Sequence, residues 1–237
     1  MRMRIRVAMA AAVLLSSAAH AQTGGGGVIK GRVLLRGTPP AAQKVKVSAD
    51  PQCQAQHPQG LEHSDFRVAN GGLADVVVYL KSGVKGTFAA PTEAAVLDQK
   101  GCQYAPGLVA VQAGQPLKIR NSDATLHNVH FRPALNKEIN VGQPRAGMES
   151  SRVFSKAEVL VPIGCDVHPW MRASLAVLAH PFFAVSGETG TFEIRNVPPG
   201  TYEIEARHGK LKPVSATVTV SGGETPVDLT LVIEPSK

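Results

Sequence analysis

The stretch Cys165-Asp-Val-His168-Pro-Trp-Met171 places a thiolate, an imidazole and a thioether within seven residues. Soft sulfur ligands favour Cu(I), and imidazole nitrogen binds Cu(II) as well, so a site that cycles between these states needs both. Two His and one Cys in a plane, with a distant axial Met, make up such a site. The stretch supplies three of those four ligands and predicts a site for one copper ion.

The fourth ligand should be a His from another part of the fold. His127, in Asn121-Ser-Asp-Ala-Thr-Leu-His127-Asn128-Val, follows a turn-forming cluster and stands where a strand resumes. Zinc also binds one Cys and two His, so it is the alternative ion for the same residues.

Two segments carry a family resemblance. Cys-x2-His-x2-Met resembles the ligand loop of short-loop cupredoxins such as amicyanin, and Asn-x5-His-Asn-Val resembles the segment with the first His ligand in plastocyanin-type and azurin-type proteins. The resemblance implies that His127, Cys165 and His168 are equatorial ligands and that Met171 is the axial one. It also implies that Asn128 ties the two ligand loops together.

The resemblance has one departure and one further implication. Cupredoxins usually have an aromatic residue two positions before the Cys, where this chain has Ile163. Family members present an apolar patch around the second His, which makes Trp170 a candidate for partner contact, with a place in the core as the alternative. His168, the ligand in the exposed loop, is the expected exit point for the electron.

The first residues have the pattern of a signal peptide. Three arginines precede the apolar run Val7–Leu15, which is too short to span a bilayer, and Ala19-His-Ala21 is a small-x-small cleavage pattern. We therefore expect a signal peptide over residues 1–21, a periplasmic product and no membrane span.

Composition agrees with an exported β protein. The chain has 25 Lys+Arg against 18 Asp+Glu, three of the arginines lie in the signal segment, and the remainder form no basic cluster of the kind that nucleic acid binding requires. The 23 Gly and 17 Pro suit short strands joined by many turns.

The three cysteines divide into two roles. With Cys165 assigned to the metal, Cys53 and Cys102 form a pair, and in an oxidising compartment a disulfide is the plain interpretation. The alternative is a second metal site, because His57 lies near Cys53 in the sequence.

A second resemblance concerns domain organisation. The stretch Gly190-Thr-Phe-Glu-Ile-Arg-Asn-Val-Pro-Pro-Gly200-Thr-Tyr-Glu-Ile204 resembles the carboxypeptidase-regulatory-like (transthyretin-like) β-sandwich, a non-catalytic module. The N-terminal Gly31-x-Val33 and Gly37-x-Pro39 resemble the same module's opening strands.

We therefore predict an all-β protein: a Greek-key cupredoxin β-sandwich plus a small transthyretin-like β-sandwich. The expected divisions are a Gly-rich linker over 22–27, N-terminal strands over 28–48 that complete the C-terminal module, a copper domain over 49–184, and the C-terminal module over 185–237.

Two other histidines are expected to be structural. An odd offset from His127 points His130 to the opposite face of a regular strand. The strand after the ligand loop would carry His180 about 20 Å away from the copper end.

These features favour an electron carrier over an enzyme, because the four-ligand set has no obvious open position for a substrate. The expected partner is a periplasmic redox protein such as a c-type cytochrome or an oxidoreductase. Two alternatives stay open: a periplasmic copper carrier or storage protein, and a non-metal β-sandwich interaction module.

Overall fold

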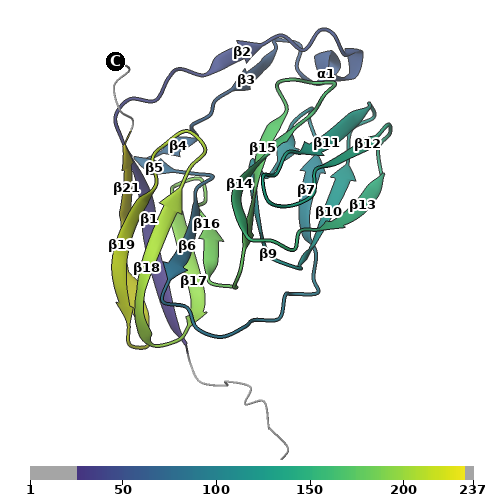
Figure 1. Ribbon diagram of the computed structural model, residues 1–237. Helices are drawn as coiled ribbons and strands as arrows, with labels where there is room; N and C mark the ends of the chain where they lie inside the picture. Colours follow the sequence, from purple (N-terminus) through teal and green to yellow (C-terminus); the bar gives the residue numbers. More distant parts are fainter. Residues whose placement is uncertain (1–25, 233–237) are drawn as a thin grey trace, which may run out of the picture.

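The computed structural model describes residues 26–232 (Figure 1). The predicted signal peptide, most of the predicted linker and residues 233–237 lie outside the described residues. Within residues 26–232, α1 (Pro51–Gln56) is the only α-helix and the remaining elements are strands. The expected fold class, an all-β protein built of sandwiches, is confirmed.

The first sandwich packs a six-stranded sheet on a four-stranded one. The six-stranded sheet is organised around β1 (Gly27–Arg36), which pairs with four strands: β17 (Thr191–Val197), β5 (Gly72–Leu73), β20 (Glu224–Pro226) and β21 (Leu229–Val232). The short β4 (Val68–Ala69) extends it through β5. The facing sheet contains, in order, β16 (Phe183–Val185), β6 (Val77–Ser82), β18 (Gly200–Arg207) and β19 (Val214–Val220).

The second sandwich has a four-stranded and a five-stranded sheet. The first contains, in order, β13 (Glu149–Val153), β10 (Pro116–Asn121), β7 (Ala95–Gln99) and β8 (Tyr104–Ala105). The second contains β12 (Ile139–Gln143), β11 (His127–Phe131), β14 (Glu158–Gly164), β15 (Arg172–Leu178) and β9 (Leu108–Gln112).

Each sandwich has its own apolar core, because alternate side chains of a strand point to opposite faces of the sheet. In β6, Val78 and Leu80 enter the core of the first sandwich, whereas Val77 and Tyr79 face the other way. Those two residues pack with Leu108 and with β15, so a smaller apolar cluster joins the two sandwiches.

The strand pairings differ from the predicted boundaries in two respects. The short strands β4 and β5 lie inside the range 49–184 expected for the copper domain, yet they join the first sandwich through β1. β6 lies inside the same range, yet it pairs with β18 of the first sandwich. Its apolar, β-branched sequence suits a strand that is buried on both faces, and nothing local says which sandwich it joins. β1, in the range 28–48, pairs with β17 and β21, and its first residue, Gly27, was assigned to the linker.

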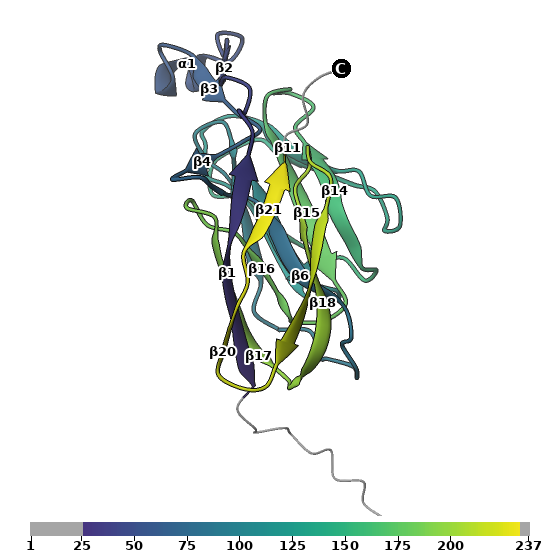
Figure 2. The ribbon, with the colours of Figure 1, turned by 90° about the vertical axis from the view of Figure 1, so that its left-hand side faces the viewer.

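A separate two-stranded sheet, β2 (Gln43–Val45) with β3 (Leu61–His63), flanks α1. Figures 1 and 2 show this segment at one end of the molecule, reaching from the first sandwich over the end of the second. In the described part of the chain, no helix has the length and apolar character needed to cross a membrane.

Candidate metal centre

One predicted ligand lies at the start of a strand of the five-stranded sheet, and the other three lie on the loop that follows a neighbouring strand. His127 is the first residue of β11, and Cys165 directly follows β14. His168 and Met171 lie in the loop between β14 and β15. Because β11 and β14 pair side by side in antiparallel register, their ligand-bearing ends meet at the same edge of the sandwich.

Three of these side chains converge. Nδ1 of His127 lies 2.9 Å from Nδ1 of His168, and Sγ of Cys165 lies 3.9 Å from the latter nitrogen. The donor atoms of the three residues all lie within 4.8 Å of one another. Met171 is buried in the same core, its N–H donates to the His168 carbonyl, and its own carbonyl accepts from the Cys165 N–H.

These separations suit one small ion. Two nitrogens bound at about 2 Å lie about 3.3 Å apart in a tetrahedral site, and a nitrogen and a thiolate sulfur lie roughly 3.5–3.9 Å apart. Two imidazole lone pairs that face each other in a buried site also need a cation or a proton between them. The donor set therefore fits a copper or a zinc ion, and the role of these residues as metal ligands stays a prediction.

Each imidazole is held from behind by a carboxylate. Nε2 of His127 lies 2.9 Å from Oδ2 of Asp123, and Nε2 of His168 lies 3.1 Å from Oδ2 of Asp50. A carboxylate that accepts the Nε2–H leaves the Nδ1 lone pair free for a metal. Neither carboxylate was predicted from the sequence. The four-residue spacing before His127 could have indicated Asp123, whereas no local signal marks Asp50.

The surroundings keep both carboxylates ionised. Burial alone would raise the pKa of Asp123, but hydrogen bonds from the backbone amides of Cys102 and Gly101 outweigh it and the net pKa is lowered. Burial likewise opposes the lowering of the Asp50 pKa, which results chiefly from the Thr125 hydroxyl and from backbone amides. Burial lowers the pKa of His127, and Asp123 only partly offsets this, so the imidazole is neutral at pH 7 and suited to bind a metal.

Asn128 joins the two ligand segments, the geometry that the cupredoxin resemblance implies. Its Oδ1 accepts the Cys165 thiol at 3.2 Å and the Asp166 amide at 2.8 Å. Its Nδ2 donates to the Asp166 carboxylate at 2.8 Å and to Asn140 at 2.7 Å. In addition, Tyr104 donates its hydroxyl proton to the Asn128 carbonyl.

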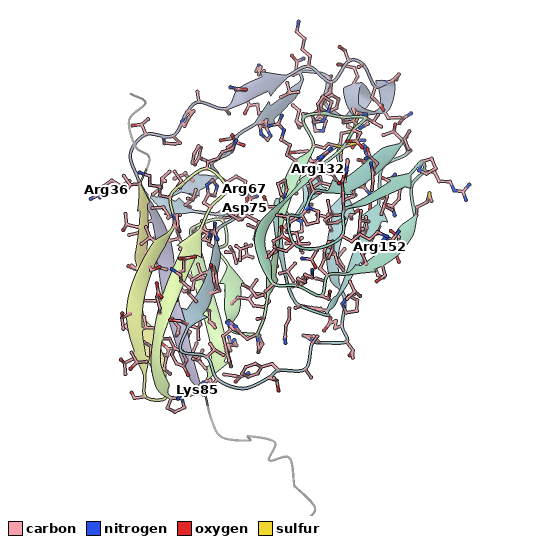
Figure 3. All side chains as sticks on the ribbon, viewed as in Figure 1. Arg36, Arg67, Asp75, Lys85, Arg132 and Arg152 are labelled. Atoms are coloured by element: carbon pink, nitrogen blue, oxygen red, sulfur yellow. A yellow bond between two sulfur atoms is a disulfide. The ribbon has the colours of Figure 1, made fainter. Side chains whose placement is uncertain are left out.

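An exposed polar cluster surrounds Asp166, next to Cys165 in the chain. Arg132, labelled in Figure 3, donates to the Asp166 carboxylate at 2.8 Å, and His130 contacts the same carboxylate and Glu138. Hydrogen bonds from His130 and Asn140 lower the pKa of Asp166 to about 2. His130 therefore contacts two carboxylates and is not one of the three converging residues.

The predicted disulfide is present between Cys53 and Cys102, with their Cα atoms 5.7 Å apart. It excludes the alternative of a second metal site on Cys53 with His57, because the sulfur is consumed and the His57 ring contacts the Gly101 carbonyl. Trp170 packs against the disulfide cluster and donates to the Cys102 carbonyl at 3.1 Å.

His168, the expected exit point for the electron, is buried, although Val167 and Pro169 beside it in the loop are exposed. Only 1% of this residue is accessible, because Asp50 covers its Nε2 edge and the ring of Trp170 lies 4.9 Å away. Trp170 itself is half-buried, so its role in partner contact stays a prediction. His180 bonds to the Leu80 carbonyl in the first sandwich and takes no part in the metal centre.

Comparison with known proteins gives weak structural similarities. No family model and no curated protein matches the chain. A mutant of amicyanin in its Cu(I) form is 24% identical, with a TM-score of 0.32 over 42% of this chain and 97% of its own. A purple cupredoxin from Nitrosopumilus maritimus is 21% identical, with a TM-score of 0.30 over 35% of this chain and 98% of its own. The similarity covers less than half of the chain, and assignment of the site depends on the residues above.

Proposed function

We propose that this protein carries single electrons through a mononuclear copper site formed by His127, Cys165, His168 and Met171. The observation that carries the proposal is the convergence of the two Nδ1 atoms and the thiol sulfur of three buried residues, with both outer Nε2 atoms held by carboxylates. When bound, copper would supply a one-electron Cu(II)/Cu(I) couple.

The chain's contribution is a rigid frame. Backbone hydrogen bonds close the loop that contains Cys165, His168 and Met171, and Asn128 fixes that loop to β11. Because such a frame holds the ligands in one geometry in both oxidation states, the reorganisation energy of electron transfer would be small. We place this activity in the periplasm, with a c-type cytochrome or an oxidoreductase as partner, and we propose a transthyretin-like identity for the first sandwich.

The test is a Cu(II) titration of the purified protein, followed by visible and electron-spin-resonance spectra. Wild type is expected to bind one ion with intense thiolate-to-copper charge transfer, which Cys165→Ser abolishes. His130→Gln, near the site but outside the donor set, serves as the matched control and should leave the spectrum unchanged. A colourless complex in the wild type would refute the electron-carrier proposal, and tight Cu(I) binding without a reversible couple would favour a copper carrier.

A further inference from the structure

Residues 43–63, which comprise β2, α1 and β3, form a cap over the end of the second sandwich (Figure 1). Its two strands pair only with each other. Its attachments to the second sandwich include the disulfide from Cys53 to Cys102 and a 2.8 Å contact between Nε2 of His57 and the Gly101 carbonyl. The cap is therefore anchored at the metal centre and not in either large core.

Asp50 is the residue of the cap that reaches the centre. Its Oδ1 accepts the amides of Gln52 and Cys53, at 2.8 and 3.1 Å, and so caps the start of α1. Its Oδ2 accepts the Thr125 hydroxyl at 2.6 Å and contacts Nε2 of His168 at 3.1 Å. Four hydrogen bonds fix this carboxylate, so the orientation of the His168 ring depends on the position of the cap.

The disulfide joins the two cysteines whose amides bind the carboxylates behind the two imidazoles. The Cys53 amide donates to Asp50, and the Cys102 amide donates to Asp123 at 2.8 Å. Asp123 lies four residues before His127 on the same segment, whereas Asp50 lies 118 residues from His168. The carboxylate that contacts His127 thus lies on the same segment as this His. The carboxylate that contacts His168 lies on a separate element, which the disulfide tethers.

We propose that Asp50 is a positioning residue for His168 and that the cap shields this imidazole from redox partners. Asp50 holds the tautomer with Nε2–H toward the carboxylate and the Nδ1 lone pair toward Cys165 and His127. The consequence for electron exit rests on the proposed function, whereas the positioning of the ring does not.

The first test uses the copper-free protein. Nitrogen-15 NMR of the imidazoles is expected to show His168 as a single Nε2–H tautomer in the wild type and as a mixture of tautomers in Asp50→Ala. Glu62→Ala, an exposed acidic residue on the same cap, is the matched control and should resemble the wild type. An unchanged His168 signal in Asp50→Ala would overturn the positioning role.

The second test measures access to the ring. Carbethoxylation of His168, followed by mass spectrometry, should be at least tenfold faster in Asp50→Ala and in Cys53→Ala/Cys102→Ala than in wild type, with modification of His130 as the internal reference. The double variant keeps the test decisive if Asp50→Ala does not fold. Equal rates in folded variants and wild type would overturn the shielding role.

The same variants separate this inference from the copper proposal. A mixture of His168 tautomers in copper-free Asp50→Ala supports the positioning role even if no blue copper spectrum forms. If the spectrum forms, the electron self-exchange rate measured by NMR line broadening should increase about tenfold when the cap is untethered. A normal spectrum with an unchanged self-exchange rate would overturn the shielding of electron exit and leave the copper site intact.

Discussion

Oδ1 of Asn128 lies 3.2 Å from Sγ of Cys165, and it also accepts the amide of the next residue, Asp166, at 2.8 Å. One side chain on β11 therefore fixes the start of the loop after β14. Because β11 also contains His127, the contact sets the separation between the two halves of the metal centre. Asn128 and Cys165 are both buried, so water does not replace the hydrogen bond between them when it is lost.

Asn128→Ala should leave the Asp166 amide and the Cys165 thiol without their shared acceptor. A buried polar group left without a partner costs about 1–3 kcal/mol, so we expect a loss of that order in the free energy of unfolding. Denaturant titration of the copper-free protein measures it. Asn136→Ala removes a polar side chain from a loop remote from the ligands and should have the same copper spectrum as the wild type. Asn128→Ala should have a different one.

Much of this centre could be predicted from sequence because its parts are local. The spacing of Cys165, His168 and Met171 places three side chains on one short loop whatever the rest of the fold does. The disulfide followed from the assignment of Cys165 to the metal, which left two cysteines as a pair. These predictions needed residue types and spacing, with no knowledge of the sheet order.

The remainder depends on contacts between distant segments. No local sequence signal marks Asp50, and only the tertiary fold brings it to His168. For the same reason the sequence does not indicate that the His168 ring is buried. β6 was expected in the copper domain because a β-branched apolar run suits any buried strand, and its partner β18 is more than a hundred residues away in the sequence.

Met171→Leu separates packing from ligation. The side chain is 1% exposed, and Leu has a similar volume, so the free energy of unfolding should change by less than about 1.5 kcal/mol. Loss of the soft thioether should weaken Cu(I) binding on the order of tenfold, or about 1.4 kcal/mol. Competition with a Cu(I) chelator measures the affinity. Met148→Leu, outside the ligand loop, is the control, and equal affinities in both variants would exclude Met171 as a ligand.

Gly31→Ala tests the closure of the first sandwich by β1. A Cβ at Gly31 would lie 1.6 Å from the backbone carbonyl oxygen of Val227, which cannot move without disturbing the strands beside it. We expect a loss of at least about 2 kcal/mol in thermal or chemical unfolding. At Gly142, in β12 of the second sandwich, an added Cβ meets nothing within 4 Å, so Gly142→Ala is the matched control. Equal stabilities would contradict the pairing of β1 with the C-terminal strands.

His180 should make the stability of the protein depend on pH. Its Nε2 donates to the Leu80 carbonyl at 2.8 Å and its Nδ1 accepts the Phe182 amide at 3.2 Å, so the neutral ring satisfies both contacts. Burial lowers the pKa of His180 below the ordinary value of 6.5. At a pH near or below 6.5 the unfolded chain therefore binds more protons than the folded protein does. For this reason the free energy of unfolding decreases on acidification.

The expected contribution is at most about 1.4 kcal/mol per pH unit between the unfolded and the folded pKa. Urea unfolding at pH 7, 6 and 5 measures the slope, which should become shallower in His180→Gln. Comparison of slopes removes any loss of stability that the substitution causes at every pH, so an unaltered slope in His180→Gln would mean that the protonation of His180 is not linked to unfolding.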